Sequence, residues 1–225
     1  MSMLILFLTR YSGVVYYYER DHFTAMRITA QAKVATKERI VSAAVKLFAK
    51  QGWDGTTTRD LATAAGIAAG TLFNYFQSKE AVVASLVSDA LAKAQHDFET
   101  DHDASQSLEE DLFAFIWIGL KSLRKLRGVL ASALETILSP LARSSLQCPG
   151  DSIRADHLEA VEQIILAHGV PGPVPAVTMQ LYWTLYLGVI AYWAADDSPN
   201  QEDTLALLDQ STRLFAGLTI GGAKS

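Results

Sequence analysis

The chain has few of the residues that cross-link a fold or interrupt helices. Its 225 residues include one cysteine, Cys148, and only six prolines. A single cysteine excludes an internal disulfide and suits a reducing cytoplasm, where we expect the protein to act. We interpret Cys148 as an inert loop thiol, with redox sensing as the alternative. Half of the residues are hydrophobic, with many Ala and Leu. This composition predicts an all-α protein with a sizeable core.

Signatures of catalysis are also missing from the sequence. It has no Gly-rich phosphate loop, no Cys/His cluster at metal-ligand spacing and no nucleophile elbow. We therefore expect no enzyme activity, no cofactor and no metal. The acidic, His-containing stretch 96–103 is interpreted as a solvated helix end, with metal binding as the alternative. The basic residues of 124–127 suit a helix C-terminus, with an anion site for an effector as the alternative.

Two apolar stretches raise the question of a membrane. The run 1–8 has eight apolar and small residues, whereas a spanning helix needs about 20. We expect residues 1–26 to be a mis-assigned start or a disordered extension, with a real N-terminal extension as the alternative. The run 176–195 is longer, but Gln180, Thr184 and Gly188 interrupt it. It is typical of a helix buried in protein, often against another subunit, with membrane association as the alternative.

Charge is distributed unevenly along the chain, whose net charge is −5. Residues 27–80 hold eight Lys or Arg against four acids, whereas residues 81–225 hold nine against eighteen. Residues 1–26 are balanced. A basic segment joined to an acidic body indicates phosphate contact at one end of the protein. We therefore divide the chain into 1–26, 27–80 and 81–225.

Hydrophobic periodicity predicts a series of helices separated by breaks rich in Gly, Pro or polar residues. The expected helices are 36–50, 59–65, 68–76, 78–102, 108–127, a shorter one to 138, 151–168, 176–195 and 201–218.

A helix-turn-helix is the most informative local pattern. Gly52 can end the first helix, and Thr57 with Asp60 three residues later is a capping-box pattern. Gly66 then separates two short helices, and Ser78 caps the next one. Two short helices joined by a tight turn can place the second in a DNA major groove.

Residues 37–80 carry a specific set of matches to a known family. The matching residues are Lys37-Glu38-Arg39-Ile40, Leu47-Phe48, Gly52, Thr56-Thr57, Leu61-Ala62, Ala65-Gly66, Gly70-Thr71-Leu72-Phe73, Tyr75-Phe76 and Ser78-Lys79-Glu80. On these residues the chain resembles the tetracycline-repressor (TetR) family of bacterial transcriptional regulators. The rest of the chain matches only in length, helical content and bulky apolar final helices.

The resemblance implies which residues contact DNA. They are Thr57, Thr58, Arg59, Ala68, Ala69, Gly70, Thr71, Phe73, Asn74, Tyr75 and Lys79. Arg59 suits guanine and Asn74 suits adenine, because each side chain can pair bidentately with its base. Lys79 is expected to contact phosphate. Phe73 stands where Tyr is commoner, so a phenolic phosphate contact is lost. Because few side chains can read bases, specificity is expected to depend on Arg59, Asn74 and DNA shape.

The resemblance also implies a C-terminal domain that binds a small molecule and dimerises. Large side chains in the long helices are candidates for an apolar pocket: Phe113, Trp117, Leu120, Trp183 and Tyr186. They are equally suited to the core. The helices at 176–195 and 201–218 are expected to pair with their copies in a four-helix bundle. The candidate contacts are Leu187, Ile190, Trp193, Leu205, Leu208 and Phe215.

The sequence therefore predicts a homodimeric, ligand-responsive transcriptional repressor that binds a palindromic operator. An apolar or aromatic effector would release it from double-stranded DNA. The alternative is a small-molecule-binding protein or enzyme with a vestigial DNA-binding module.

Overall fold

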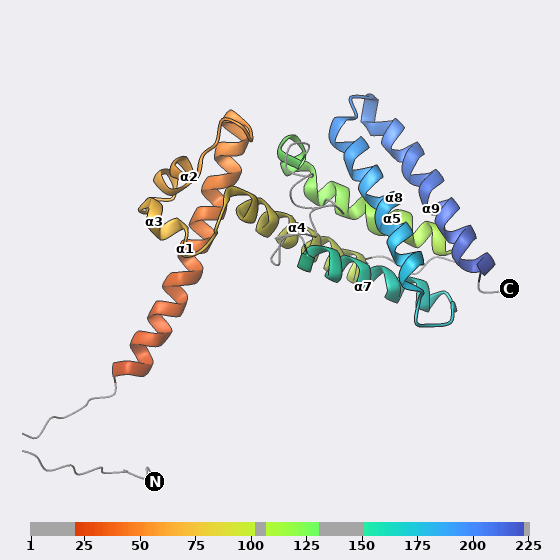
Figure 1. Cartoon of the computed structure of the whole chain (residues 1–225), viewed down its shortest axis with the longest axis horizontal. Helices are drawn as coiled ribbons and strands as arrows, with labels where there is room; N and C mark the ends of the chain where they lie inside the picture. The colour runs from red at the N-terminus through yellow and green to blue at the C-terminus, as the bar shows by residue number, and fades with distance from the viewer. Residues whose placement is uncertain (1–20, 102–106, 131–150, 223–225) are drawn as a thin grey trace, which may run out of the picture. The chain divides into compact units, whose positions relative to one another are not determined.

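The computed structural model describes residues 21–101, 107–130 and 151–222, and the regular structure in these ranges is entirely helical (Figure 1). The predicted all-α class is confirmed. The elements are α1 (Asp21–Gln51), α2 (Thr58–Ala64), α3 (Ala69–Leu72), α4 (Lys79–Asp101), α5 (Leu108–Leu123), the 3-10 helix η1 (Arg124–Leu126), α7 (Asp151–Ala167), α8 (Ala176–Ala195), the 3-10 helix η3 (Pro199–Gln201) and α9 (Glu202–Gly222). The predicted helix before 138 and the predicted loop at 139–150 fall outside the described residues, as does Cys148.

Helix α1 begins well before the expected Thr36. The sequence between Asp21 and Gln51 has neither Gly nor Pro and is rich in Ala, so helix propensity extends beyond the apolar stripe that begins at Ile40. Contacts between Cα atoms divide the chain into two units, 1–37 and 38–225, with the boundary inside α1.

The first part of the second unit is a small helical core. The end of α1, helices α2 and α3 and the start of α4 bury apolar side chains against one another: Ile40, Ala44, Phe48, Leu61, Ala62, Leu72, Phe76, Val82 and Val83. Gly52 ends α1 with a φ of +71°, and Gly66 turns the chain after α2 with a φ of +67°. Both values lie in the left-handed region that favours glycine, so both predicted breaks are confirmed.

Helices α4 to α9 form a second, larger core. Helix α5 is its central member, because α5 packs against α4, α7, α8 and α9. Helices α8 and α9 lie side by side and are joined by a short connection (Figure 1). The bounds of α8 match the prediction, whereas α9 continues to Gly222.

The connection between α8 and α9 is held by side-chain caps. The Asp196 carboxylate accepts hydrogen bonds from the backbone N of Ser198 at 2.8 Å and of Thr204 at 3.0 Å. Bonds from Ser198 and Thr204 hold the pKa of Asp196 well below its usual range. Arg127 Nε donates to Trp193 O at 2.8 Å, and Arg127 also donates to Asp196 O. Arg127 is therefore occupied with capping α8, which weakens its interpretation as part of an anion site.

Among the described helices, none is both long and apolar enough to cross a membrane. The described residues also contain no group of three or more His, Cys, Asp or Glu placed to hold a metal ion. Of the stretch 96–103, residues 102 and 103 lie outside the described ranges, and Asp97 pairs with Lys93 at 2.7 Å.

Candidate functional site

Helix α2 begins with the predicted capping box. Thr57 Oγ1 accepts from Asp60 N at 3.2 Å, while Asp60 Oδ2 accepts from Thr57 N at 2.9 Å and from Thr57 Oγ1 at 2.7 Å. These bonds from Thr57 lower the pKa of Asp60. The Thr57 hydroxyl proton is thus used inside the protein. Thr58 and Arg59, which follow on the first turn, remain at least partly exposed.

Helix α3 is shorter than predicted. The α-helix covers Ala69–Leu72, and the turn continues with hydrogen bonds from Asn74 N to Thr71 O and from Tyr75 N to Leu72 O. Side-chain periodicity cannot distinguish this tighter i→i+3 turn from a continuing α-helix, because both keep Leu72 and Phe76 facing inward.

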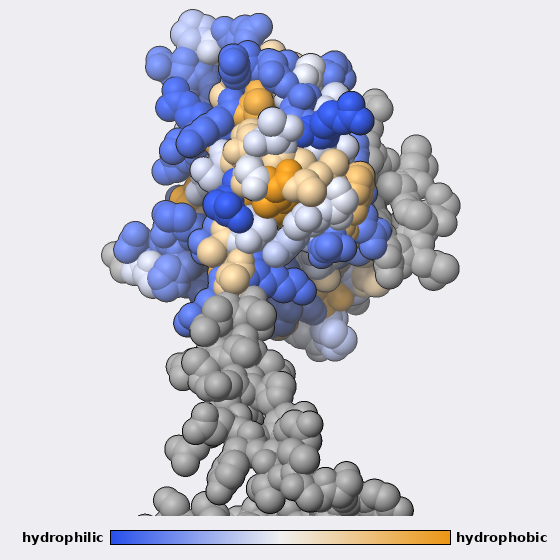
Figure 2. All heavy atoms as spheres, turned by 90° about the vertical axis from the view of Figure 1, so that its left-hand side faces the viewer, coloured by the Kyte–Doolittle hydropathy of each residue, from blue (hydrophilic) through white to orange (hydrophobic). Residues whose placement is uncertain are grey.

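One side of α3 is available to a partner molecule. The inward residues Leu72 and Phe76 are buried, whereas Phe73 is 50% exposed and Tyr75 is half-buried. Figure 2 shows the molecule from the α2–α3 end, where hydrophilic residues surround a small hydrophobic group. The predicted DNA-contacting residues on and around α3 that are exposed are Ala68, Ala69, Gly70, Phe73 and Asn74, and Thr71 is partly exposed.

Lys79 has partners within the protein. Its Nζ donates to Trp53 O at 3.0 Å and to Thr56 O at 3.3 Å, and it lies 4.1 Å from the centre of the Trp53 ring. An ammonium group has three donor hydrogens, so two are used here. Lys79 therefore joins the start of α4 to the turn before α2. This role cannot be predicted from the sequence, because the carbonyl acceptors lie more than twenty positions away.

A cavity of about 240 Å³ lies between α4, α5, α7 and α8. Its lining is mostly apolar, with a few polar groups: Ser88, Leu91, Ala92, Ala94, Gln95, Phe115, Ile116, Gly119, Ile153, Asp156, His157 and Tyr186. A hollow of about 290 Å³ lies beside it and shares Gln95 and Phe115 with it. A concave, mainly apolar site with a few polar groups is typical of small-molecule binding.

His157 is a buried polar residue in the cavity wall. Its Nε2 lies 2.9 Å from the Tyr182 hydroxyl, and its ring stacks on Tyr186 with 4.0 Å between ring centres. Burial lowers the pKa of His157 to about 3 and raises the pKa of both tyrosines. The imidazole is therefore neutral at physiological pH.

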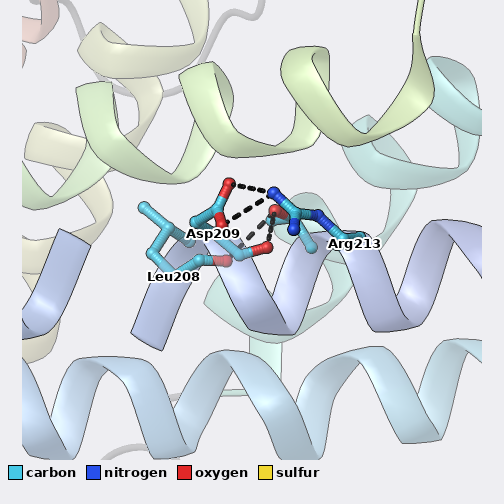
Figure 3. Close-up of polar contacts among 4 residues, drawn as sticks. Leu208, Asp209 and Arg213 are labelled. Carbon is cyan, nitrogen blue, oxygen red and sulfur yellow. Dashed lines mark hydrogen bonds and ion pairs between the residues drawn. The ribbon is translucent and has the colours of Figure 1, made fainter. Parts of the chain in front are cut away.

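The structure brings one of the five predicted pocket residues, Tyr186, to this cavity. Leu120 and Trp183 are buried in the core, and Trp117 packs against it. Phe113 lines a separate hollow on α5 and α9 with Asp209 and Thr212. Arg213 pairs with Asp209 at 2.9 Å beside this hollow (Figure 3). The Thr212 hydroxyl donates to Leu208 O of its own helix.

The sequence interpretation missed Asp156 and His157. His157 lies four residues after Ile153 and four before Val161, on the buried stripe of α7. A histidine on an otherwise apolar stripe was the available signal, because such a group needs a polar partner inside the protein.

Most of the predicted dimer contacts are buried within the protomer. Ile190, Trp193, Leu208 and Phe215 are each at most 1% exposed and pack in the protomer's own core. Leu187 and Leu205 are only partly exposed. The large apolar side chains that α8 and α9 expose are instead Val177, Leu181, Tyr192, Leu214, Leu218 and Ile220. Periodicity showed that α8 is apolar nearly all round but did not show which side faces inward.

Comparison with known proteins identifies the α1–α4 region. The family described as "Bacterial regulatory proteins, tetR family" matches residues 40–86. The TetR family is therefore the family that residues 40–86 resemble. Two relatives from Bacillus subtilis each match about a third of the chain. The transcriptional regulator YerO is 33% identical over 34% of this chain and 24% of its own length, and the probable regulator YttP is 31% identical over 38% and 42%. The chain thus spans less than half of these curated relatives.

Structural similarity extends beyond this domain. The structure of Thermus thermophilus FadR, a TetR-family repressor in complex with lauroyl-CoA, has a TM-score of 0.60 and is 23% identical. The similarity covers 80% of this chain and 92% of that one. At this identity the likeness establishes the fold of the C-terminal helices and leaves their ligand open.

Proposed function

We propose that this TetR-family chain is a DNA-binding transcriptional repressor that acts in the cytoplasm and is controlled by a small molecule. The observation that carries the proposal is the α2–α3 motif, in which a buried inner face supports an exposed outer face, within the region that matches the family. The second helix of such a motif fits the major groove.

Base recognition in this proposal depends on two exposed side chains. The Arg59 guanidinium donates two hydrogen bonds to guanine O6 and N7, and the Asn74 amide pairs with adenine N6 and N7. Gly70 and the two alanines before it add no bulk, so the backbone of α3 approaches the groove closely. Thr58, Thr71 and Tyr75 supply hydroxyl groups for phosphate oxygens.

The protein acts as a homodimer through α8 and α9. Both helices expose large apolar residues; Leu214 is 57% exposed and Leu218 is 54% exposed. Gly188 and Gly217 have open space where a side chain would be, which allows a second pair of helices to approach. A two-fold interface places two α3 helices on a palindromic site with half-sites about 34–36 Å apart.

Helix α4 links ligand binding to DNA binding. Its middle lines the cavity through Ser88, Leu91 and Gln95, and its first residue, Lys79, bonds to the turn before α2. An effector that favours one position of α4 therefore shifts the DNA-binding helices. The size of this shift is limited by the difference between the effector's affinities for the two arrangements.

The test is an electrophoretic shift with the DNA upstream of the gene. We expect a shifted band that a scrambled fragment does not compete away, and loss of sequence preference in the double variant Arg59→Ala, Asn74→Ala. A folded protein that binds cavity ligands but no DNA would instead favour the alternative, a small-molecule-binding protein or enzyme with a vestigial DNA-binding module. The cavity between α4 and α8 is the observation that keeps that alternative open.

A further inference from the structure

We propose that the cavity between α4, α5, α7 and α8 binds a neutral or cationic organic molecule of about two fused rings, and that it excludes anions. This inference rests on the proposed function, because it gives the chemical class of the effector at that site. It is carried by the size of the cavity, the aromatic rings in its wall and the single charge among its lining residues.

The size of the cavity sets the size of the molecule. An apolar cavity of roughly 150 Å³ is enough to bind benzene. At about 240 Å³ this cavity is larger by more than half, which leaves room for a second ring. Phe115, His157 and Tyr186 place ring surfaces in the wall, so a flat aromatic guest can stack or meet ring edges.

The charge of the lining decides between ligand classes. Among the lining residues that the structure describes, Asp156 is the only one with a formal charge, since His157 is neutral. An anion placed here would lose hydration and lie near a carboxylate. A cation would gain the Asp156 carboxylate and the faces of the aromatic rings. Ser88 and Gln95 offer uncharged hydrogen-bonding groups to either a neutral or a cationic guest.

Two basic residues on the lining helices, Arg154 and Lys93, have other partners. Arg154 is the only Lys or Arg on α7; its Nη2 donates to Gln180 Oε1 at 2.7 Å, and its guanidinium lies over the Trp183 ring. On α4, Lys93 pairs with Asp97 at 2.7 Å. Neither residue lines the cavity. The acyl-CoA of the FadR complex carries phosphates, and this lining has no cation to receive such a group.

The experiment compares three probes that share one ring system: 2-naphthylmethanol, (2-naphthyl)methylammonium and 2-naphthoate. Each is titrated calorimetrically into the full chain at pH 7. We expect the ammonium to bind at least as tightly as the alcohol, and the naphthoate to bind at least about tenfold more weakly than the alcohol. Naphthoate binding that equals or exceeds the alcohol, or no binding by any probe, would overturn the proposal.

Variants on α7 test whether the Asp156 carboxylate causes the preference for the ammonium probe. Asp156 is exposed at the cavity, so Asp156→Asn should weaken binding of the ammonium relative to the alcohol by about two- to fivefold while changing alcohol affinity little. Glu159→Gln is the matched control, because Glu159 is an exposed carboxylate on the same helix outside the cavity. An unchanged preference in Asp156→Asn, or an equal change in Glu159→Gln, would refute the assignment.

A cavity-filling variant tests whether the probes occupy this site. A Cβ on Gly119 would meet only Leu91 Cδ2, at an ordinary 3.5 Å, so Gly119→Leu extends into the cavity from a tolerated starting point. It should abolish binding of the alcohol while circular dichroism stays unchanged. Unchanged binding would place the ligand elsewhere. If the probes follow the expected charge order but the chain binds no DNA, the ligand class stands and the regulator proposal fails.

Discussion

The ammonium group of Lys79 lies 4.1 Å from the centre of the Trp53 ring and donates to the carbonyl oxygen of the same residue at 3.0 Å. Trp53 in turn stacks at a tilt on Phe48, with 5.7 Å between ring centres. One lysine thus fixes the start of α4 to the turn after α1. Both contacts are within the protein, so Lys79 contributes to the fold whether or not its third donor hydrogen reaches a phosphate.

The first prediction concerns this contact. Lys79→Ala should lower the free energy of unfolding by about 1–3 kcal/mol, because a cation–π contact and two carbonyl hydrogen bonds are lost. Operator affinity should fall with it for all sequences. Urea denaturation and a salt titration of binding measure the two effects. Lys46→Ala, which removes an exposed lysine of α1, is the control. A loss of affinity with unchanged stability would mean that Lys79 acts only as a phosphate contact.

The second prediction concerns base readout. Arg59→Ala and Asn74→Ala should each reduce discrimination at one base position by about 1–3 kcal/mol, because each removes a bidentate pair. Both residues are exposed, so the free energy of unfolding should change little. Competition binding with single-base operator variants measures the discrimination. Lys50→Ala removes an exposed charge without a base partner and should weaken all sequences alike. Unchanged preference in both variants would refute the assignment.

The third prediction uses a glycine that the fold does not require. Gly70 lies inside α3, and an added Cβ would meet no atom within 4 Å. Gly70→Ala should therefore raise stability by about 0.5–1 kcal/mol through helix propensity. It should nevertheless weaken operator binding, because the new methyl group separates the α3 backbone from the DNA. Thermal unfolding and gel shift separate the two effects. Unchanged affinity would show that α3 does not approach DNA at this position.

Structural features that depend on neighbouring residues could be predicted from the sequence, whereas features that depend on tertiary packing could not. Capping and turn chemistry are local, so Thr57, Gly66 and Ser78 marked the start and end of helices correctly. The side of a helix that faces inward is not local when the helix is apolar all round. Trp193 and Leu181 both lie on α8, yet Trp193 is 1% exposed and Leu181 is 40% exposed, because α5, α7 and α9 pack against one side of α8.

The cavity could not be predicted from the sequence either, because it also depends on how the helices pack. Its walls come from four helices that are distant in sequence, and its polar members are ordinary surface residue types. Large aromatic residues were the natural candidates from composition, but Trp183 fills the core instead. A cavity forms where side chains are small, here at Ala92, Ala94 and Gly119, and no pattern along one helix indicates that small residues of α4 and α5 line the same cavity.

The fourth prediction concerns the dimer and uses the exposed residues of α8 and α9. Leu181→Glu combined with Leu218→Glu should give folded monomers, because charges would be buried at the two-fold interface. Operator affinity should fall, since each half-site would be bound alone. Sedimentation measures the mass and circular dichroism checks the fold. Leu208→Ala is the contrasting variant: Leu208 is fully buried, so its truncation should cost about 2–5 kcal/mol of stability without a direct effect on association. A dimer unchanged by the double variant would place the interface elsewhere.

The last prediction is a pH dependence that arises from His157. Burial lowers the pKa of its imidazole from 6.5 to about 3 in the folded protein. Below pH 6.5 the unfolded chain therefore binds a proton that the folded chain does not. The stability contributed by this histidine is fully present above pH 6.5 and is lost as the pH falls toward 3, at up to about 1.4 kcal/mol per pH unit.

Urea denaturation at pH 7.5, 6, 5 and 4 should show this slope. His157→Gln keeps a hydrogen-bonding group for Tyr182 but cannot titrate, so its stability should fall less steeply over the same range. Equal slopes for the two proteins would show that His157 is protonated in the fold and that the cavity wall carries a positive charge in acid.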